Sequence, residues 1–364
     1  MRYSRTIPAV LAAAALAATA AAARADSVSM TNGLRYDGVT VDGAVDGVVR
    51  FRVNGRTPIE KPQDEIAVIE MADDPRLTAA EKTAGEGKIK EAIPGYRDAL
   101  GAATLGWKRT LIRYRLMKAA ETGGKIDLAV ATWLEIVDAA AGAPAAVASR
   151  PRKLPARGDA GNAKAIAALE AKASLVKQEQ YLRTVLRLLA DLYEREGRLK
   201  DAQAVIERLS GETASTASST GQEPASAPSA GADQVRLARL AWKAGDFGRV
   251  VAELKPKLRV LGAADLPEAL YLLGKVQSAL AGKAEDAKVA RDLRIEAGLN
   301  LMRVVALFGG DENVPDALLE AGRINHALGN DVAARATWGE VTTLYKNSPA
   351  AQQASKALAE LDGK

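Results

Sequence analysis

Cysteine is absent from this chain of 364 residues, histidine occurs once, and aromatic residues make up only 4%. A zinc site of the His-Glu-x-x-His type needs two histidines and a cysteine-rich zinc site needs cysteines, so both are excluded. A serine triad could use only His326, and no Gly-x-Ser-x-Gly turn occurs. Counting leaves open an enzyme that uses carboxylates alone. Because the common catalytic and metal-binding constellations are excluded, we expect no enzymatic activity, no bound metal and no cofactor.

The first 25 residues have the pattern of an export signal. Arg2 and Arg5 form a short basic start, an uncharged run rich in alanine follows, and Ala23-Arg24-Ala25 ends it with the small residues that signal peptidase accepts. A retained membrane anchor is the alternative, but a run of about 17 weakly apolar residues is short for a span. We predict cleavage after Ala25 and a periplasmic or secreted protein with no membrane span.

Most of the basic excess of the chain lies in this signal. The formal charge is +5, and removal of three arginines and no acidic residue lowers it to +2. Such a small charge does not indicate a nucleic-acid partner. The 339 residues that remain are enough for two or more domains. Without cysteine, these domains depend on packing rather than on disulfides.

Residues 26–73 differ from all that follows. They alternate β-branched and polar residues, and they contain Asn32-Gly33, Asp42-Gly43, Asp46-Gly47 and Asn54-Gly55, pairs that favour the positive φ angles of tight hairpins. We predict about five short antiparallel strands in a small sheet or barrel. Together with the Gly33, Tyr36, Gly38 spacing, this pattern loosely resembles Sm-like small barrels. We do not carry over the RNA binding of that family, because we expect the module to be exported.

The rest of the chain is predicted to be helical, with two interruptions. Residues 141–163 are rich in Pro, Ala and Gly, and residues 210–233 form a Ser/Thr/Ala/Pro tract that has too little apolar bulk to order itself. The predicted segments are a signal peptide (1–25), a β module (26–73), helical hairpins (76–140), a Pro/Ala-rich linker (141–163), a hairpin (164–209), a disordered linker (210–233) and C-terminal hairpins (234–362).

A recurring pattern marks the hairpins. A large apolar residue is followed four positions on by a small one, then by a turn glycine, an alanine and a bulky residue. Tight antiparallel helices need Gly or Ala where their backbones touch, and a turn glycine caps the first helix in the left-handed conformation. Two copies are complete, and the remaining packing positions come from partial ones. We assign repeat packing to Ala190, Gly197, Ala202, Gly245, Gly322, Gly329, Ala334 and Trp338.

These hairpins resemble the tetratricopeptide repeat (TPR) family. The complete copies run Leu186, Ala190, Gly197, Ala202, Ile206 and Leu318, Gly322, Gly329, Ala334, Trp338, whereas partial copies surround Gly87, Gly124, Gly245 and Gly274. Pro94 is expected to disturb the second helix of the first copy, and the helix over 284–308 to be unusually long. A generic array of hairpins, or one bundle of unrelated hairpins, is the alternative. The resemblance implies a mainly α fold of TPR-like hairpins that stack into a superhelix.

The segment 293–357 has a further likeness. Its Phe308-Gly309-Gly310-Asp311 link, its last hairpin and its Ser348-Pro349 ending look like periplasmic TPR proteins of the envelope-coordination type. This likeness agrees with the predicted export.

Position in the repeat indicates which side chains face the concave groove. Trp242 with its basic neighbours could anchor a peptide or an acidic tail, or it could be an ordinary packing residue. His326 could contact a partner or be an ordinary polar residue near a helix end. The candidate partner-binding residues are Arg187, Asp191, Arg239, Trp242, Lys243, Arg323 and His326.

Three functions remain open at this point. The first is an adaptor that binds partner proteins or peptides through the concave face of the repeats. The second is a cell-envelope polymer (glycan) binding protein in which the β module contacts the glycan and the repeats oligomerise. The third is an enzyme of unknown type. We favour the adaptor, and a homo-oligomer is compatible with either of the first two.

Overall fold

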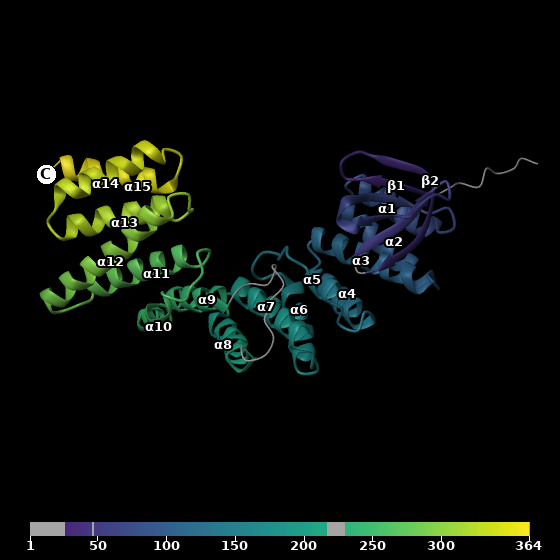
Figure 1. Ribbon diagram of the computed structural model, residues 1–364, viewed down its shortest axis with the longest axis horizontal. Helices are drawn as coiled ribbons and strands as arrows, with labels where there is room; N and C mark the ends of the chain where they lie inside the picture. The colour runs from purple at the N-terminus through teal and green to yellow at the C-terminus, as the bar shows by residue number, and fades with distance from the viewer. Residues whose placement is uncertain (1–25, 46, 217–229, 364) are drawn as a thin grey trace, which may run out of the picture. The chain divides into compact units, whose positions relative to one another are not determined.

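The computed structural model describes residues 26–45, 47–216 and 230–363, and it divides the chain into two compact units with a boundary between Pro155 and Ala156 (Figure 1). That boundary lies in the segment 141–163 that the sequence marks as a linker. The signal-peptide prediction, residue 46 and most of the second predicted linker lie outside the described residues. No helix in the described ranges is long and apolar enough to cross a membrane.

The N-terminal unit starts with an antiparallel five-stranded sheet in the order β4-β3-β2-β1-β5. Gly33, Asn54 and Gly55 adopt the positive φ angles that the sequence predicts for turns, and so does Gly47. Asp42-Gly43 is not a turn, contrary to our prediction, because it lies inside β2 at an irregularity of its pairing with β3. The strands are β1 (Asp26–Met30), β2 (Arg35–Val45), β3 (Val48–Val53), β4 (Ile59–Pro62) and β5 (Ile66–Glu70).

Helices pack on one face of this sheet and share its hydrophobic core, which runs from Val28 in β1 to Ala119 in α3. Pro94 lies inside α2 without breaking it. The missing N–H of Pro94 leaves a carbonyl at Lys90, which is exposed to water. The helices are α1 (Pro75–Gly85), α2 (Ile89–Ala102), α3 (Gly106–Thr122), α4 (Ile126–Ala139) and α5 (Pro144–Ala148).

A buried carboxylate joins the sheet to three helices. Glu81 in α1 is 1% exposed, and its two oxygens accept hydrogen bonds from the Ile69 amide of β5 and the Tyr96 hydroxyl of α2, each at 2.8 Å. Arg115 of α3 lies 3.4 Å from the same carboxylate and donates to the Ile66 carbonyl. The β module is therefore fixed to the helices by buried polar contacts as well as by apolar packing.

The C-terminal unit is a series of antiparallel helices in which each contacts the next. Helix α12, the second helix of the α11–α12 hairpin, is 21 residues long. This agrees with the unusually long helix that the sequence predicts over 284–308. The helices are α6 (Ala160–Ala173), α7 (Glu179–Glu196), α8 (Leu199–Thr216), α9 (Ala230–Lys243), α10 (Phe247–Leu254), α11 (Leu266–Ala281), α12 (Ala287–Leu307), α13 (Val314–Ala327), α14 (Asp331–Leu344) and α15 (Pro349–Asp362).

The hairpins on the two sides of the second predicted linker pack together. Residues 210–216 and 230–233, which we assigned to the linker, are helical, because a helix that packing has started extends at low cost into flanking residues. Helix α8 packs on α9, and Arg249 of α10 pairs with Glu207 of α8. The hairpins before and after this segment therefore contact each other directly.

Small residues permit close helix packing in this unit. A Cβ on Gly322 of α13 would lie 2.3 Å from the indole nitrogen of Trp338 in α14, and that nitrogen donates to the Leu319 carbonyl at 3.1 Å. Ala190, Ala202 and Ala334 are fully buried. The turn glycines Gly197, Gly245 and Gly329 have φ angles of 75°, 77° and 77°. Together these residues form TPR-like helical hairpins.

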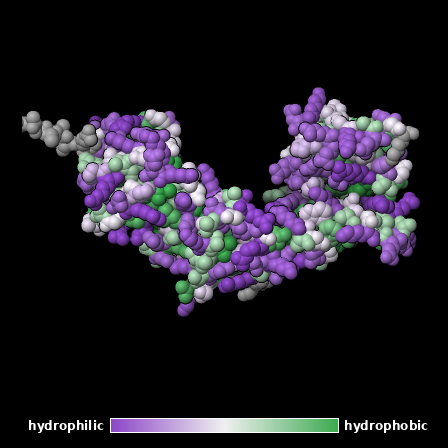
Figure 2. All heavy atoms as spheres, turned by 180° about the vertical axis from the view of Figure 1, so that it is seen from behind, coloured by the Kyte–Doolittle hydropathy of each residue, from purple (hydrophilic) through white to green (hydrophobic). Residues whose placement is uncertain are grey.

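Polar side chains cover most of the face seen in Figure 2, and apolar ones are scattered among them. Among the larger apolar residues that remain exposed, several lie on α12.

Candidate functional site

The main candidate site lies on the first helices of successive hairpins, α7, α9 and α11. Trp242 is the one aromatic residue in the sequence of α9, and its ring stacks on that of Phe247 in α10 with centroids 5.1 Å apart. The ammonium of Lys275 in α11 lies 5.1 Å from the centroids of both Trp242 and Tyr271. Trp242, Tyr271 and Lys275 are half-buried, so the two rings keep part of their surface in solvent. We call Arg239, Trp242, Lys243, Tyr271 and Lys275 the aromatic–lysine face.

Burial has an electrostatic consequence at this face. Burial raises the pKa of the Tyr271 hydroxyl, and the nearby carboxylates Asp316 and Glu320 act in the same direction. Tyr271 therefore stays neutral throughout the physiological range and can donate a hydrogen bond. Within the described part of the chain, Lys275 pairs with rings and with no carboxylate. Its charge is available to an acidic group on a partner.

Ion pairs between hairpins frame the face. Arg239 of α9 donates two hydrogen bonds of 2.6 Å to Glu268 of α11, and these bonds raise the pKa of the Arg239 guanidinium. Glu194 of α7 lies 2.5 Å from Arg236 and 3.7 Å from Lys243 of α9. A bidentate arginine–carboxylate pair fixes both position and orientation. The first helices are thus held in register along the face, which is arranged before any partner binds.

Two other residues that the sequence assigns to the concave groove, Arg187 and Asp191, are engaged in ion pairs within the chain. Arg187 is only 9% exposed and pairs with Asp233 of α9 at 3.2 Å, so the prediction that it lines an open groove is wrong. It lies between α7 and α9 because the superhelix brings the next hairpin over it. Asp191 is more accessible, but it pairs with Arg236 at 2.8 Å.

Arg323 and His326 lie on α13 of the last hairpin, and the Arg323 guanidinium is near enough to Tyr271 to act on the pKa of its hydroxyl. Arg323 pairs with Glu320 and donates to Gln353 of α15. His326 contacts Asp331 across the hairpin turn at 2.5 Å, and its ring is tilted against Trp338 at 6.1 Å. Both side chains therefore contact neighbouring helices of their own hairpin or of the terminal helix.

Sequence reasoning missed Tyr271, Lys275 and Glu268. A signal was present, because Gly274 aligns with Ala238 and Gly322 as the small packing residue. That alignment places Tyr271 and Lys275 at the positions that Arg187 and Asp191 occupy in their hairpin. This alignment was missed because the second helix of the partial copy around Gly274 departs from the repeat pattern. The Trp242–Lys275 contact joins two hairpins and follows from their stacking rather than from either sequence.

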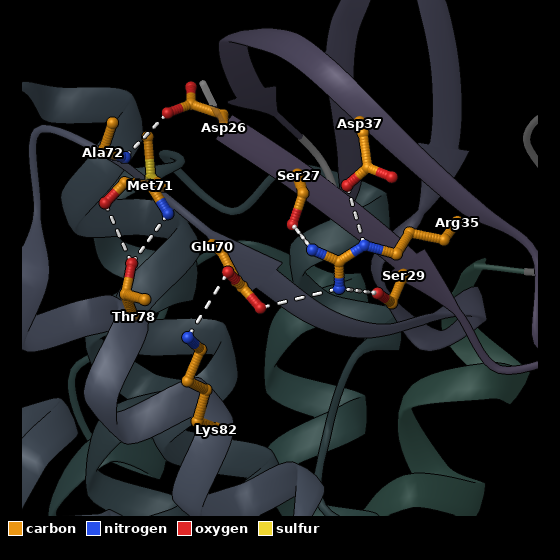
Figure 3. Close-up of polar contacts among 10 residues, drawn as sticks. All are labelled: Asp26, Ser27, Ser29, Arg35, Asp37, Glu70, Met71, Ala72, Thr78 and Lys82. Carbon is orange, nitrogen blue, oxygen red and sulfur yellow. Dashed lines mark hydrogen bonds and ion pairs between the residues drawn. The ribbon is translucent and has the colours of Figure 1, made fainter. Parts of the chain in front are cut away.

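The second candidate surface is the open face of the sheet, where polar side chains contact one another (Figure 3). Arg35 of β2 lies 2.8 Å from Asp37, donates to Ser27 of β1 at 2.8 Å and lies 3.6 Å from Glu70 of β5. The hydrogen bond to Asp37 raises the pKa of Arg35. Lys82 of α1 completes the cluster at 3.5 Å from Glu70. These groups satisfy one another and tie three strands to the first helix.

Comparisons with known proteins add little to this description. No family model matches the chain, and no curated protein matches its sequence. Solved structures that are similar include BtubC (BKLC) from P. vanneervenii, at 15% identity over 74% of this chain and 92% of that one, with a TM-score of 0.40. A chain of Podosopora anserina with nearly identical TPR-like repeats, assigned as a kinesin light chain, is similar at 17% identity over 73% and 92%, with a TM-score of 0.27. Superpositions this loose carry no argument about function.

Proposed function

We propose that this chain is a non-enzymatic adaptor, exported to the periplasm or secreted, that binds a protein or peptide through the aromatic–lysine face. The observation that carries the proposal is the position of Lys275 between the rings of Trp242 and Tyr271 on two successive hairpins. Half-buried aromatic rings give large contact area at small cost in side-chain entropy, which is why Trp and Tyr dominate protein-binding surfaces.

The geometry supports a partner segment that carries both apolar groups and a carboxylate. The two rings would pack against apolar side chains or the backbone of an extended segment. The Lys275 ammonium would meet a carboxylate, either of an acidic side chain or of a chain terminus. The pair between Arg239 and Glu268 holds the neighbouring helix in place, so little ordering is needed upon binding.

Affinity purification from the exported fraction of the source cells tests the proposal, with the full chain as bait. We expect a stoichiometric protein to co-purify with the wild-type chain and to be lost with Lys275→Ala. Lys356→Ala is the matched control, because Lys356 on α15 is 80% exposed and distant in sequence from the face. Equal recovery with both variants would contradict the proposed face, and retention of the chain on insoluble envelope polymer would favour the glycan-binding alternative.

Export is tested separately. Amino-terminal sequencing of the chain from the exported fraction should begin at Asp26. A chain that retains residues 1–25 and stays with the membrane would contradict cleavage.

A further inference from the structure

Helix α12 is the longest helix in the described residues of the C-terminal unit, and its two sides are both apolar. One side contributes Ala297, Leu301 and Val304 to the core. The opposite side carries large apolar residues that are open to solvent: Ile295 is 43% exposed, Leu299 58% and Met302 44%. A helix that packs one side against a core normally presents polar residues on the opposite side.

The exposed residues follow the spacing of a helix–helix seam. Ile295, Leu299, Met302 and Ala306 are separated by four, three and four positions, which is the a/d spacing of a coiled coil. All four are on the solvent side of α12. We call these four residues the α12 seam. It covers about three helical turns, enough to bury a continuous apolar strip against a second helix.

Charged residues at the edges of the seam make it complementary to itself. Glu296 and Arg303 each follow a seam residue by one position, so both lie on the same edge. Glu296 pairs with Lys255 at 2.6 Å. In an antiparallel pair of α12 helices, Leu299 packs against Met302 of the partner subunit, and Glu296 lies opposite Arg303 of the partner subunit. A two-fold axis forms both contacts twice.

The antiparallel orientation also avoids repulsion. The seam continues toward the N-terminus of α12 with Asp292 and Lys288 at the next two seam positions. In a parallel pair, each of these residues would face its own copy, and like charges directly opposite are destabilising. In the antiparallel pair, Ile295 packs against Ala306 of the partner subunit, and Asp292 lies beyond the end of the partner helix.

We propose that the α12 seam is the interface of a homodimer, formed by antiparallel pairing of α12 with α12 of a second copy. This interface uses none of the residues of the aromatic–lysine face. The dimer therefore presents two copies of that face, which would raise the avidity for a partner that has two binding segments. The inference does not depend on the proposed function, because the seam is defined by α12 alone.

Sedimentation of the purified chain tests the dimer. We expect the wild-type chain to be dimeric at about 10 µM, and Leu299→Lys to weaken dimerisation at least about tenfold. Leu344→Lys on α14 is the matched control, because Leu344 is also exposed, at 64%, and lies outside the seam. A wild-type chain that stays monomeric at about 100 µM, or equal effects of the two variants, would overturn the proposal.

The absence of cysteine from the chain allows a clean test of orientation. Under mild oxidation, a mixture of Ile295→Cys and Ala306→Cys chains should form disulfide-linked dimers. The Ile295→Cys chain alone should not, because antiparallel pairing separates the two copies of that position by about 16 Å along the helices. Efficient cross-linking of the Ile295→Cys chain alone would exclude the antiparallel arrangement. A third outcome is a wild-type chain that is monomeric and a Leu299→Lys variant that no longer captures a co-purifying protein. That outcome would overturn the homodimer and assign the seam to another partner.

Discussion

The two compact units hold their helices together in different ways. In the N-terminal unit, the sheet and α1 to α3 share one core, and the fully buried Glu81 connects β5, α2 and α3. In the C-terminal unit, small residues bring the two helices of a hairpin close together, and partly exposed ion pairs such as Arg239–Glu268 join successive hairpins. In the first arrangement, the polar groups at the joint between sheet and helices are buried and bind one another. The second leaves aromatic and charged side chains at the joints between hairpins, and this is where we place binding.

The sharpest test of this contrast is removal of the buried carboxylate. Glu81→Ala leaves Arg115 buried without its partner, and such a loss typically costs about 3–5 kcal/mol. We expect urea unfolding followed by circular dichroism to show an early transition of the N-terminal unit. Glu60→Ala is the control, because Glu60 pairs with Arg50 on the surface, where both side chains are more than half exposed. If Glu81→Ala unfolds like the wild-type chain, the buried contacts do not hold the sheet to the helices.

The second largest effect concerns close packing in the C-terminal unit. Gly322→Ala places a methyl group 2.3 Å from the Trp338 ring, and overpacking of this kind costs about 1–3 kcal/mol. Gly339→Ala in α14 is a matched control, because a Cβ at Gly339 meets no atom within 4 Å. In a helix that change should stabilise by about 0.5–1 kcal/mol. Equal unfolding midpoints for the two variants would show that the close contact is not needed.

A turn glycine should have an intermediate effect. Gly329 has open space around its α-carbon, but its φ angle is +77°. Gly329→Ala therefore brings backbone strain without a clash, and we expect a loss of about 1 kcal/mol in thermal or urea unfolding. Gly329→Asn should recover part of this loss, because asparagine tolerates the left-handed conformation. A full loss with asparagine as well would point to a cause other than backbone strain.

The smallest effect is expected at the ion pair that frames the aromatic–lysine face. Arg239 and Glu268 are 42% and 31% exposed, so solvent screens their attraction. A double-mutant cycle with Arg239→Ala and Glu268→Ala should give a coupling free energy below about 1 kcal/mol. A coupling as large as the loss from Glu81→Ala would remove the distinction between the two units.

Local features of the fold could be predicted from the sequence. Gly197 and Gly329 end helices in the left-handed conformation, and Ala190 and Ala334 are buried, because both properties depend on spacing within one hairpin. The strands of the sheet follow from alternation and from turns such as Asn54-Gly55. The same reasoning failed at Asp42-Gly43, where pairing with β3 continues the strand through a sequence that favours a turn.

Features that depend on the packing of one hairpin on the next could not be predicted. The sequence placed Arg187 in an open groove, but the stacking of α9 on α7 buries it against Asp233. The same stacking brings Lys275 over Trp242, 33 positions away. Glu81, Tyr96 and Arg115 meet only because the sheet and two hairpins share a core. The resemblance to Sm-like barrels and the export signal remain predictions.

The central claim is that partners bind the C-terminal unit through the aromatic–lysine face. Capture of the co-purifying protein should be measured with the full chain, with Trp242→Ala and with Arg35→Ala, after circular dichroism has shown that both variants are folded. Trp242 belongs to the face, whereas Arg35 lies at the centre of the polar cluster on the sheet. We predict that Trp242→Ala loses most of the captured protein and that Arg35→Ala retains it. Retention by Trp242→Ala together with loss by Arg35→Ala would contradict the account and assign binding to the sheet.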